Sequence, residues 1–375
     1  MNVGCVPKKL YVYGSEFGKA FKDAAGFGWQ VGEAAFDWAT LRDNKSREIG
    51  RLNSIYERLL HGSGATTLDG MARLIDAHTV EVNGIQYQAD KILLATGSWP
   101  TKPDFPGNEH AITSNEIFDL ESFPERLLVI GGGYIATEFA GIFNGLGSQV
   151  TQLYRGDLFM RGFDDDIRSF AAEEIRKTGV DLRFNTNIES LTLVNDGCEA
   201  RLTDGSTLVV DTVLCATGRH PNIKGLGLEH TKVTLDSRGY VKADAQFQTD
   251  EPSIFALGDM TGGPQLTPVA IAQAMAFAHT HFGNDSKVMD YEFIPTAVFC
   301  QPNIGTVGLT EEAARDLGLE LQIFKSDFRP MKHTLSGRDE RTLMKLIVDK
   351  STDRVIGLHM AVSYTHLRAH ETSGY

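Results

Sequence analysis

The feature that most constrains this fold is a glycine-rich turn between a strand and a helix. The stretch Gly131-Gly132-Gly133-Tyr134-Ile135-Ala136 fits the pattern G-x-G-x-x-[GA]. Residues 126–130 read as a strand, 134–146 as a helix and 149–154 as a second strand. The glycines allow a tight turn and close approach of a pyrophosphate to the helix N-terminus, and Ala136 permits close helix–strand packing. The pattern predicts a βαβ unit that binds a dinucleotide; the alternative is a purely structural glycine turn.

Two arginines bear on which dinucleotide this unit binds. Arg155 stands at the end of the second strand, and Arg161 follows six residues later. Proteins that bind NAD usually place an acidic residue there, to accept hydrogen bonds from the ribose 2′-hydroxyl. A carboxylate would repel a 2′-phosphate, whereas guanidinium groups can bind it in bidentate fashion. We therefore predict NADP, with two solvated surface arginines as the alternative.

The rest of the chain suggests a second nucleotide-binding domain and a third domain of another kind. Two expected strands end in Ala-Thr-Gly, at 92–97 and 213–218, and this repetition suggests two similar domains. From about Asp290 onward the pattern becomes β-rich with short helices. The other elements that we expect are helices at 8–26 and 40–61, short antiparallel strands over 68–96 with a hairpin signal at Asn83-Gly84, and a strand at 254–259.

Composition narrows the class of protein further. A chain of 375 residues is long enough for two or three domains. The formal net charge of −13 argues against a nucleic-acid partner, and the sequence has no apolar run long enough to span a membrane. Four scattered cysteines do not make a secreted disulfide framework, so we expect a cytoplasmic protein. Cys215 and Cys300 read as buried small hydrophobic residues, Cys198 as a loop thiol, and no zinc-ligand spacing is present.

The N-terminal stretch Asn2-Val3-Gly4-Cys5-Val6-Pro7-Lys8-Lys9 carries a family resemblance. It is similar to the second half of the redox motif C-x-N-x-G-C-x-P-K of the flavin disulfide reductases. In that family the second cysteine lies against the flavin, and the first attacks the substrate disulfide. Cys5 matches the flavin-side cysteine, and its partner would fall immediately before Met1. A thiolate at Cys5 requires a depressed pKa, which a helix N-terminus can supply.

Other segments resemble the glutathione reductases in particular. Gly133-Tyr134-Ile135-Ala136-Thr137-Glu138 is similar to their G-Y-I-A-x-E, and 51–56 is similar to their R-L-N-x-I-Y. Gly258-Asp259 with Thr267 resembles the second FAD motif. The resemblance implies catalytic roles for Cys5, Lys8 and Glu138, with the last two paired near the flavin. It implies FAD-binding roles for Lys8, Ala72, Thr96, Gly97, Gly258, Asp259 and Thr267. The NADP-binding residues that we expect are Gly131, Gly132, Gly133, Tyr134, Ile135, Glu138, Arg155, Arg161, Gly218, Arg219, Gln265 and Ala297.

Tyr56 matches a tyrosine at the disulfide pocket of the family, although it could also be a core-facing helix aromatic. Met275 stands where some glutathione reductases place an arginine for a glutathione carboxylate, which leaves trypanothione- or mercuric-type reductases as alternatives.

The implied fold is α/β, with two Rossmann-like nucleotide-binding domains and the start of an α+β dimer-interface domain. The FAD domain lacks its first βαβ unit, whereas the NADP domain is complete. The expected ranges are an FAD-binding domain over 1–97, an NADP-binding domain over 98–221, a second part of the FAD and central domain over 222–289, a partial dimerisation domain over 290–362 and an artefactual tail over 363–375.

The implied reaction is reduction of glutathione disulfide by NADPH, through FAD and a redox-active cysteine pair, in a homodimer. The first FAD loop, the partner cysteine and the family's acid/base histidine in H-P-T-x-x-E-E are absent from the 375 residues, and His366 and His370 do not replace that histidine. We therefore expect this chain to bind NADP weakly or not at all, to hold little FAD and to show no turnover. A non-catalytic NADPH-binding fragment is the alternative reading.

Overall fold

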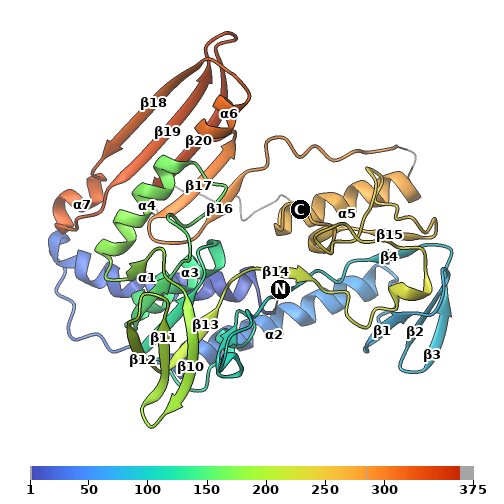
Figure 1. Cartoon of the computed structure of the whole chain (residues 1–375), viewed down its shortest axis with the longest axis horizontal. Coiled ribbons are helices and arrows are strands. Elements are labelled where there is room, and N and C mark those ends of the chain that lie inside the picture. Colours follow the sequence, from blue (N-terminus) through green and yellow to red (C-terminus); the bar gives the residue numbers. More distant parts are fainter. Residues whose placement is uncertain (1, 284, 364–375) are drawn as a thin grey trace. The chain divides into compact units, whose positions relative to one another are not determined.

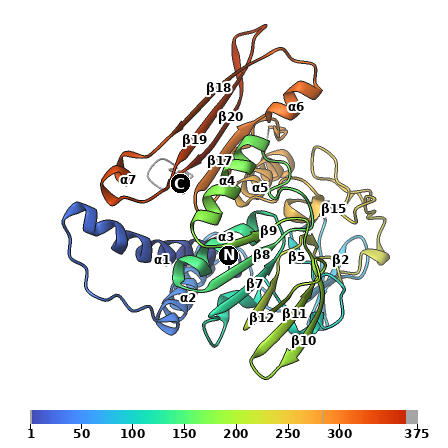
Figure 2. The same ribbon diagram turned by 60° about the vertical axis from the view of Figure 1, so that its left-hand side comes forward.

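The computed structural model describes residues 2–283 and 285–363, so all of the expected tail except Ser363 lies outside the described residues. The chain forms two compact units. Unit 1 comprises residues 1–52, 102–218 and 292–375, and unit 2 comprises residues 53–101 and 219–291. Figures 1 and 2 show the elements of each unit from two sides.

The centre of unit 1 is a parallel sheet in the order β6-β13-β7-β8-β9. Its strands are β6 (Ile112–Thr113), β7 (Arg126–Ile130), β8 (Gln149–Leu153), β9 (Asp181–Arg183) and β13 (Thr212–Cys215). Helix α3 (Tyr134–Leu146) joins β7 to β8, and α4 (Asp165–Lys177) precedes β9. The strand–turn–helix–strand order predicted from the glycine motif is confirmed, with element ends within one residue of those expected.

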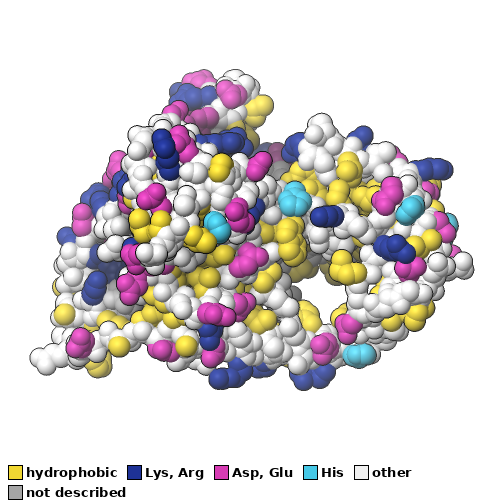
Figure 3. Space-filling model, turned by 60° about the horizontal axis from the view of Figure 1, so that its bottom comes forward, with side chains coloured by type: hydrophobic (Ala, Val, Ile, Leu, Met, Phe, Trp, Pro, Cys, Tyr) yellow, Lys and Arg dark blue, Asp and Glu magenta, His cyan; other side chains and the backbone are white. Residues whose placement is uncertain are grey.

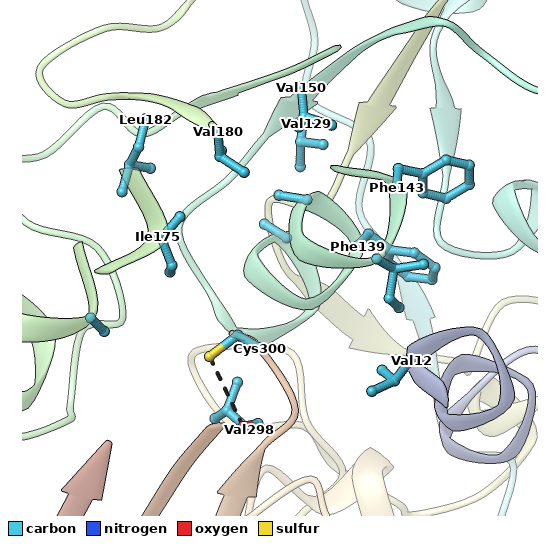
Figure 4. Close-up of a cluster of buried hydrophobic side chains, with 14 of the residues drawn as sticks. Val12, Val129, Phe139, Phe143, Val150, Ile175, Val180, Leu182, Val298 and Cys300 are labelled. Atoms are coloured by element: carbon cyan, nitrogen blue, oxygen red, sulfur yellow. Dashed lines mark hydrogen bonds between the residues drawn. The ribbon is translucent and has the colours of Figure 1, made fainter. Parts of the chain in front are cut away.

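Both faces of this sheet are covered, which explains the continuous apolar run in β7. Leu127 and Val129 belong to a core with side chains of α1, α3 and α4 (Figure 4). The alternate residues Leu128 and Ile130 belong to a second core, with side chains of an antiparallel meander. That meander consists of β10 (Ile188–Val194), β11 (Gly197–Leu202) and β12 (Thr207–Val210). A strand that is buried on both faces needs apolar side chains at every position.

The prediction for Cys198 is wrong. Cys198 lies in β11 and is buried, whereas we expected a loop thiol. The preceding Asn195-Asp196 is a turn, but the strand resumes directly at Gly197 with positive φ of 120°. Side chains then alternate inward along β11, beginning with Cys198. Cys215 and Cys300 are buried as expected.

Helix α1 (Cys5–Ala24) packs closely against α3 in unit 1. A methyl group placed on Gly145 would come 2.8 Å from the backbone oxygen of Ser15, and one on Gly18 would come 3.3 Å from that of Gly145. Such short distances show that the two helix backbones are in near contact. The close packing fixes the N-terminal turn of α1 relative to the βαβ unit.

The C-terminal part of unit 1 is an antiparallel sheet in the order β16-β17-β20-β19-β18, so the expected change of pattern beyond Asp290 is confirmed. Two short helices accompany it, α6 (Glu311–Asp316) and α7 (Met331–Ser336). The strands are β16 (Thr296–Val298), β17 (Asn303–Gly308), β18 (Leu321–Phe328), β19 (Thr342–Asp349) and β20 (Arg354–Val362). Helix α4 lies along this sheet in both Figures 1 and 2.

Unit 2 contains small sheets and one long helix, α5 (Thr267–Phe282). β1 (Ala72–Leu74), β2 (Thr79–Val82) and β3 (Ile85–Gln88) form an antiparallel sheet, and Asn83 and Gly84 at its hairpin have positive φ as expected. β4 (Ile92–Leu94) pairs in parallel with β15 (Ile254–Ala256), and β5 (Ser98–Pro100) pairs in antiparallel fashion with β14 (Arg219–Pro221). The expected strand over 254–259 therefore ends earlier, at Ala256.

The strand expected over 92–97 ends at Leu94, and one of its three residues is exposed. Ile92 and Leu94 face the core of unit 2, but Leu93 points to the other face of the β4–β15 pair and is 38% exposed. The opposite face is packed at Phe255 of β15, which lies against Phe277 of α5, but Leu93 stays partly outside this packing.

The remaining helices are α2 (Trp38–Gly62) and the 3-10 turns at Ala25–Phe27, Asn108–His110, Glu116–Asp119, Leu228–His230 and Gly258–Thr261. Among the described residues, no helix has both the length and the apolar character needed to cross a bilayer. On the face drawn in Figure 3, basic and acidic side chains are interspersed.

Candidate active site and nucleotide-binding residues

Cys5 is the first residue of α1, and it is exposed. Gly4 occupies the N-cap position, no side chain caps this helix end, and its first turn contains no acidic residue. The N-terminus of a helix carries partial positive charge, which favours an anion close to it. The site expected for a thiolate therefore has the polarity that a thiolate requires.

The other three cysteines are unsuited to nucleophilic chemistry. None of the four cysteines, all of which the structure describes, forms a disulfide. Burial raises the pKa of the Cys215 thiol to about 11, and it raises the pKa values of Cys198 and Cys300 as well. A thiol that stays protonated at neutral pH is a weak nucleophile. Cys5 is the one exposed thiol of the chain.

A buried ion pair lies one turn along the same helix. The Nζ of Lys8 donates to Oε1 of Glu138 at 2.8 Å, and both side chains are at most 10% exposed. The backbone N–H of Phe299 donates to the same Oε1 at 2.8 Å, and the Lys8 Nζ lies 4.3 Å from the centre of the Phe299 ring. α1, α3 and the segment after β16 thus meet at one carboxylate. The pairing of Lys8 with Glu138 that the resemblance implies is present in the structure.

The glycine loop is held in its turn by backbone and side-chain contacts. Gly131 has φ of +140°, and a methyl group there would come 2.2 Å from the backbone oxygen of Ala216. The buried Gln152 donates from Nε2 to the oxygen of Gly131 at 3.0 Å, and the Thr137 hydroxyl donates to the oxygen of Gly133. These contacts take up the carbonyl groups of the loop and leave the N-terminal side of α3 without a side-chain cap.

The space beside Gly133, the last glycine of the loop, is open, as a bound pyrophosphate requires. A methyl group built on Gly133 would meet no atom within 4 Å. Tyr134 and Ile135 form the first turn of α3, and Ala136 is fully buried beneath it. The residues of this loop therefore fit a dinucleotide phosphate group.

Both predicted arginines lie in the loop that follows β8, and both are exposed. Within residues 2–283 and 285–363, neither the Arg155 nor the Arg161 guanidinium forms an ion pair. Two exposed cations in the loop after β8 are available to an anionic ligand. Gly218 follows β13 with φ of +139°, and Ala297 lies in the middle of β16.

The predicted FAD residues of unit 2 gather around β5 and β14. Arg219, which we expected at the NADP site, donates from Nε to Ser98 Oγ at 2.7 Å, and that hydroxyl donates to Asp259 Oδ2 at 2.8 Å. Thr96 Oγ1 donates to the backbone oxygen of Asn222, and Gly97 follows with positive φ. These two hydrogen bonds, from Arg219 to Ser98 and from Ser98 to Asp259, therefore orient the Asp259 carboxylate, which the resemblance assigns to a ribityl hydroxyl.

Gly258 and Thr267 lie at the two ends of the segment that leads into α5. The N–H of Gly258 donates to Gln273 Oε1 at 2.8 Å, and Thr267 is the first residue of α5, an end without a side-chain cap. Ala72 is exposed in β1, next to Met71, whose side chain is 84% exposed. An exposed apolar pair beside β1 and an oriented carboxylate are features that fit the adenine part and the ribityl chain of FAD.

Two further predicted residues, Gln265 and Tyr56, lie in unit 2. Gln265, an expected NADP residue, donates to the Tyr240 hydroxyl at 3.5 Å within unit 2. Tyr56 on α2 is 53% exposed, which excludes the core-facing alternative.

Three contributors to the site were not predicted: Ser98, Phe299 and Gln152. Ser98 and Phe299 act through contacts with residues more than 120 positions away, and no local pattern marks them. Gln152 had a weak signal, because it is a polar residue in the strand that ends two positions before Arg155. A buried amide at such a position needs partners, and the oxygen of Gly131 accepts a hydrogen bond from its Nε2.

Comparison with known proteins gives the family. The family model described as pyridine nucleotide-disulphide oxidoreductase matches residues 1–274, and the model of its dimerisation domain matches residues 294–372. The glutathione reductase of Burkholderia cepacia is 45% identical over 357 residues, which are 95% of this chain and 80% of the relative. That of Nostoc sp. is 45% identical over 371 residues, covering 95% of this chain and 81% of the relative.

More distant matches agree. The trypanothione reductase of Leishmania donovani is 38% identical over 378 residues, covering 96% of this chain and 77% of the relative. Among solved structures, the HOCl-induced flavoprotein disulfide reductase RclA from Escherichia coli superposes with a TM-score of 0.87 at 27% identity, over 97% of this chain and 81% of that one. The expected α/β fold and the expected cofactors, FAD and NADPH, are confirmed. The chain therefore belongs to the pyridine nucleotide-disulphide oxidoreductase family and is a flavin disulfide reductase of the glutathione reductase type.

Proposed function

We propose that this chain serves the reduction of glutathione disulfide by NADPH. The observation that carries the proposal lies within unit 1, where the helix that begins with Cys5 holds Lys8 against Glu138 of the nucleotide-binding helix α3. The relatives named glutathione reductase are more similar, at 45% identity, than those named trypanothione reductase, at 38%. Tyr56, exposed on α2, is our candidate for the disulfide pocket.

FAD, when bound, would transfer the electrons of NADPH to sulfur. The contribution of the chain itself is electrostatic and positional. The helix N-terminus favours the thiolate of Cys5, and Glu138 neutralises the buried Lys8 while holding its Nζ in place. The glycine loop exposes the helix N-terminus of α3 to a pyrophosphate, and Arg155 and Arg161 bind a 2′-phosphate. In unit 2, Ser98 and Arg219 orient Asp259 toward a ribityl hydroxyl.

We also propose the domain limits given above. The gap of 275–293 between the two family-model matches supports the boundary at 289–290, whereas the second match extends to residue 372, beyond the proposed limit at 362. The match to a dimerisation domain supports a homodimer. The small number of cysteines, none in a disulfide, supports a reducing, cytoplasmic compartment.

We propose that the 375 residues alone show no turnover. A reducible disulfide at Cys5 needs a second cysteine with its Cα within about 7 Å. The other three cysteines are buried thiols in strands or directly after a strand, and none of them pairs with Cys5. Purified chain supplied with FAD should oxidise NADPH no faster with glutathione disulfide than without it, as followed by absorbance at the nicotinamide band. Turnover that depends on glutathione disulfide would contradict this part of the proposal.

Nucleotide selectivity can be tested without turnover. Two charge-assisted hydrogen bonds of about 1.5–3 kcal/mol each correspond to a hundredfold or greater preference for a 2′-phosphate. Calorimetric titration with 2′,5′-ADP and with 5′-AMP measures that preference even where both bind weakly. Arg155→Ala with Arg161→Ala should abolish it, whereas Arg201→Ala, an exposed arginine on β11, should preserve it. Equal binding of both nucleotides by the unsubstituted chain would contradict the NADP assignment.

A further inference from the structure

The loop that follows β8 carries both arginines, and its second half is tied down at several points. We call residues 155–163 the arginine loop. The N–H of Met160 donates to the oxygen of Gly132 at 2.6 Å, which joins the arginine loop to the glycine loop. Arg168 of α4 donates from Nε to the oxygen of Phe159 at 2.7 Å and from a terminal nitrogen to that of Leu158 at 2.5 Å. Met160 is itself fully buried, with φ of +55°.

The residue that ends this loop, Asp164, has a carboxylate with no exposure to solvent. Its Oδ1 accepts from the N–H of Asp166 and so caps α4. Its Oδ2 accepts from the N–H of Glu311, at the start of α6, at 3.1 Å. Both oxygens accept from the Nζ of Lys345, at 2.8 and 3.0 Å. Arg161 therefore lies between two fixed points, Met160 and Asp164.

Lys345 comes from the middle of β19, and its side chain is also fully buried. Its Nζ contacts two further carboxylates, those of Asp166 at 2.5 Å and Glu311 at 2.7 Å. Lys325 pairs with Asp166 and Arg315 with Glu311, so that three cations balance three carboxylates. Burial works to lower the pKa of Lys345, but its carboxylate partners outweigh burial and raise that pKa well above its usual value. The carboxylates thus favour the charged form of the lysine in the folded chain.

The ion pair between Lys345 and Asp164 links the C-terminal sheet to the end of the arginine loop. Removing one partner of a buried ion pair leaves the other charged and unpaired, so the remaining group moves toward water or another partner. Without Lys345, the carboxylate of Asp164 would face Asp166 and Glu311 with no cation between them. The end of the arginine loop would then shift, and with it the backbone of Arg161. Among the described residues, the ion pairs of this cluster include neither Arg155 nor a residue of the glycine loop.

We propose that Lys345 is a positioning residue for nucleotide selectivity, which holds Arg161 at the 2′-phosphate through the buried carboxylate of Asp164. The inference rests on the proposed NADP binding. It assigns to a strand of the C-terminal sheet a part in distinguishing NADPH from NADH. A purely structural ion pair would stabilise the fold but would leave the ratio of the two nucleotide affinities unchanged.

The test is a cycle of substitutions in the full chain, with 2′,5′-ADP and 5′-AMP as the titrated ligands. Lys345→Met should lower the preference for 2′,5′-ADP about tenfold, the loss of one charge-assisted contact, while the affinity for 5′-AMP stays the same. In a chain that already carries Arg161→Ala, Lys345→Met should cause no further loss, because the residue that it positions is gone. Lys350→Met is the matched control, since Lys350 pairs only with the exposed Glu320.

The affinity for 5′-AMP and a cooperative thermal transition show whether each variant is folded. Should Lys345→Met fail to fold, Asp164→Asn decides, because the amide oxygen can still cap α4 while the ion pair with Lys345 is lost. A folded variant that keeps the full preference, or an equal loss in the presence and absence of Arg161, would overturn the inference. Equal binding of both ligands by the unsubstituted chain would instead overturn the proposed NADP site.

Discussion

At the residue scale, individual buried charges and their hydrogen-bond partners shape the candidate active site. Glu138 illustrates the point, because its carboxylate accepts from Lys8 and from the N–H of Phe299 in a nearly water-free setting. The resemblance named Lys8 and Glu138 as partners, but it gave no sign of Phe299. Every residue except proline has a backbone N–H, so the sequence cannot indicate which one donates to Glu138. Only the folded chain shows that the segment after β16 supplies this hydrogen bond.

Lys19 of α1 is a charged residue whose burial works against stability. Burial lowers its pKa from the usual 10.5 to about 8, although Glu340 and Glu16 nearby favour the charged form. Between pH 8 and 10.5 the unfolded chain therefore binds more protons at this residue than the folded chain does. The stability of the fold should rise with pH across this window, and below pH 8 the full penalty remains.

We expect Lys19→Met to raise the free energy of unfolding at pH 7 by roughly 1–3 kcal/mol, and to lose this advantage as the pH rises from 8 to 10.5. Urea unfolding at pH 7 and at pH 10 measures both values. Lys22 is an exposed lysine on the same helix, and Lys22→Met should leave the free energy of unfolding unchanged at both pH values. An advantage of Lys19→Met that is equal at the two pH values would show that lost charge is not its cause.

At the scale of elements, the close packing of α1 on α3 aligns Cys5 and Lys8 with the nucleotide-binding helix. Glycines at the crossing make it possible, since a methyl group on Gly145 would lie 2.8 Å from a backbone oxygen of α1. The sequence predicted both helices within a few residues, but it cannot reveal which helices cross or at what distance. The relevant glycines read in sequence as weak points of a helix rather than as contacts.

Gly145→Ala should therefore destabilise the chain by about 1–3 kcal/mol, because the two helices must move apart to admit the methyl group. Gly50→Ala in α2 is the matched control. It meets open space, and alanine there should stabilise the helix by about 0.5–1 kcal/mol. Denaturant unfolding of the three chains gives the order Gly50→Ala, unsubstituted, Gly145→Ala. Equal stability of the last two would mean that α1 and α3 have room to spare.

On the scale of the whole molecule, local motifs predicted fold class, cofactors and family, because each of those depends on short patterns. The strand–glycine–helix unit around Gly131 is such a pattern, and so is the stretch around Cys5. What the sequence could not predict are pairings between distant segments, such as Lys345 with Asp164 or Arg219 with Ser98. Arg219 was expected among NADP residues, yet its contacts are with Ser98 in unit 2.

The ring of Tyr154 limits which residues can replace Gly132 in the glycine loop. It fills the space in which a side chain at position 132 would lie, 2.3 Å from where a β-carbon would start. Positions 132 and 154 therefore share one volume, and substitution at either is conditional on the other. Alanine or serine at position 132 therefore requires a small residue in place of Tyr154. Natural variants should show the same dependence between the two positions.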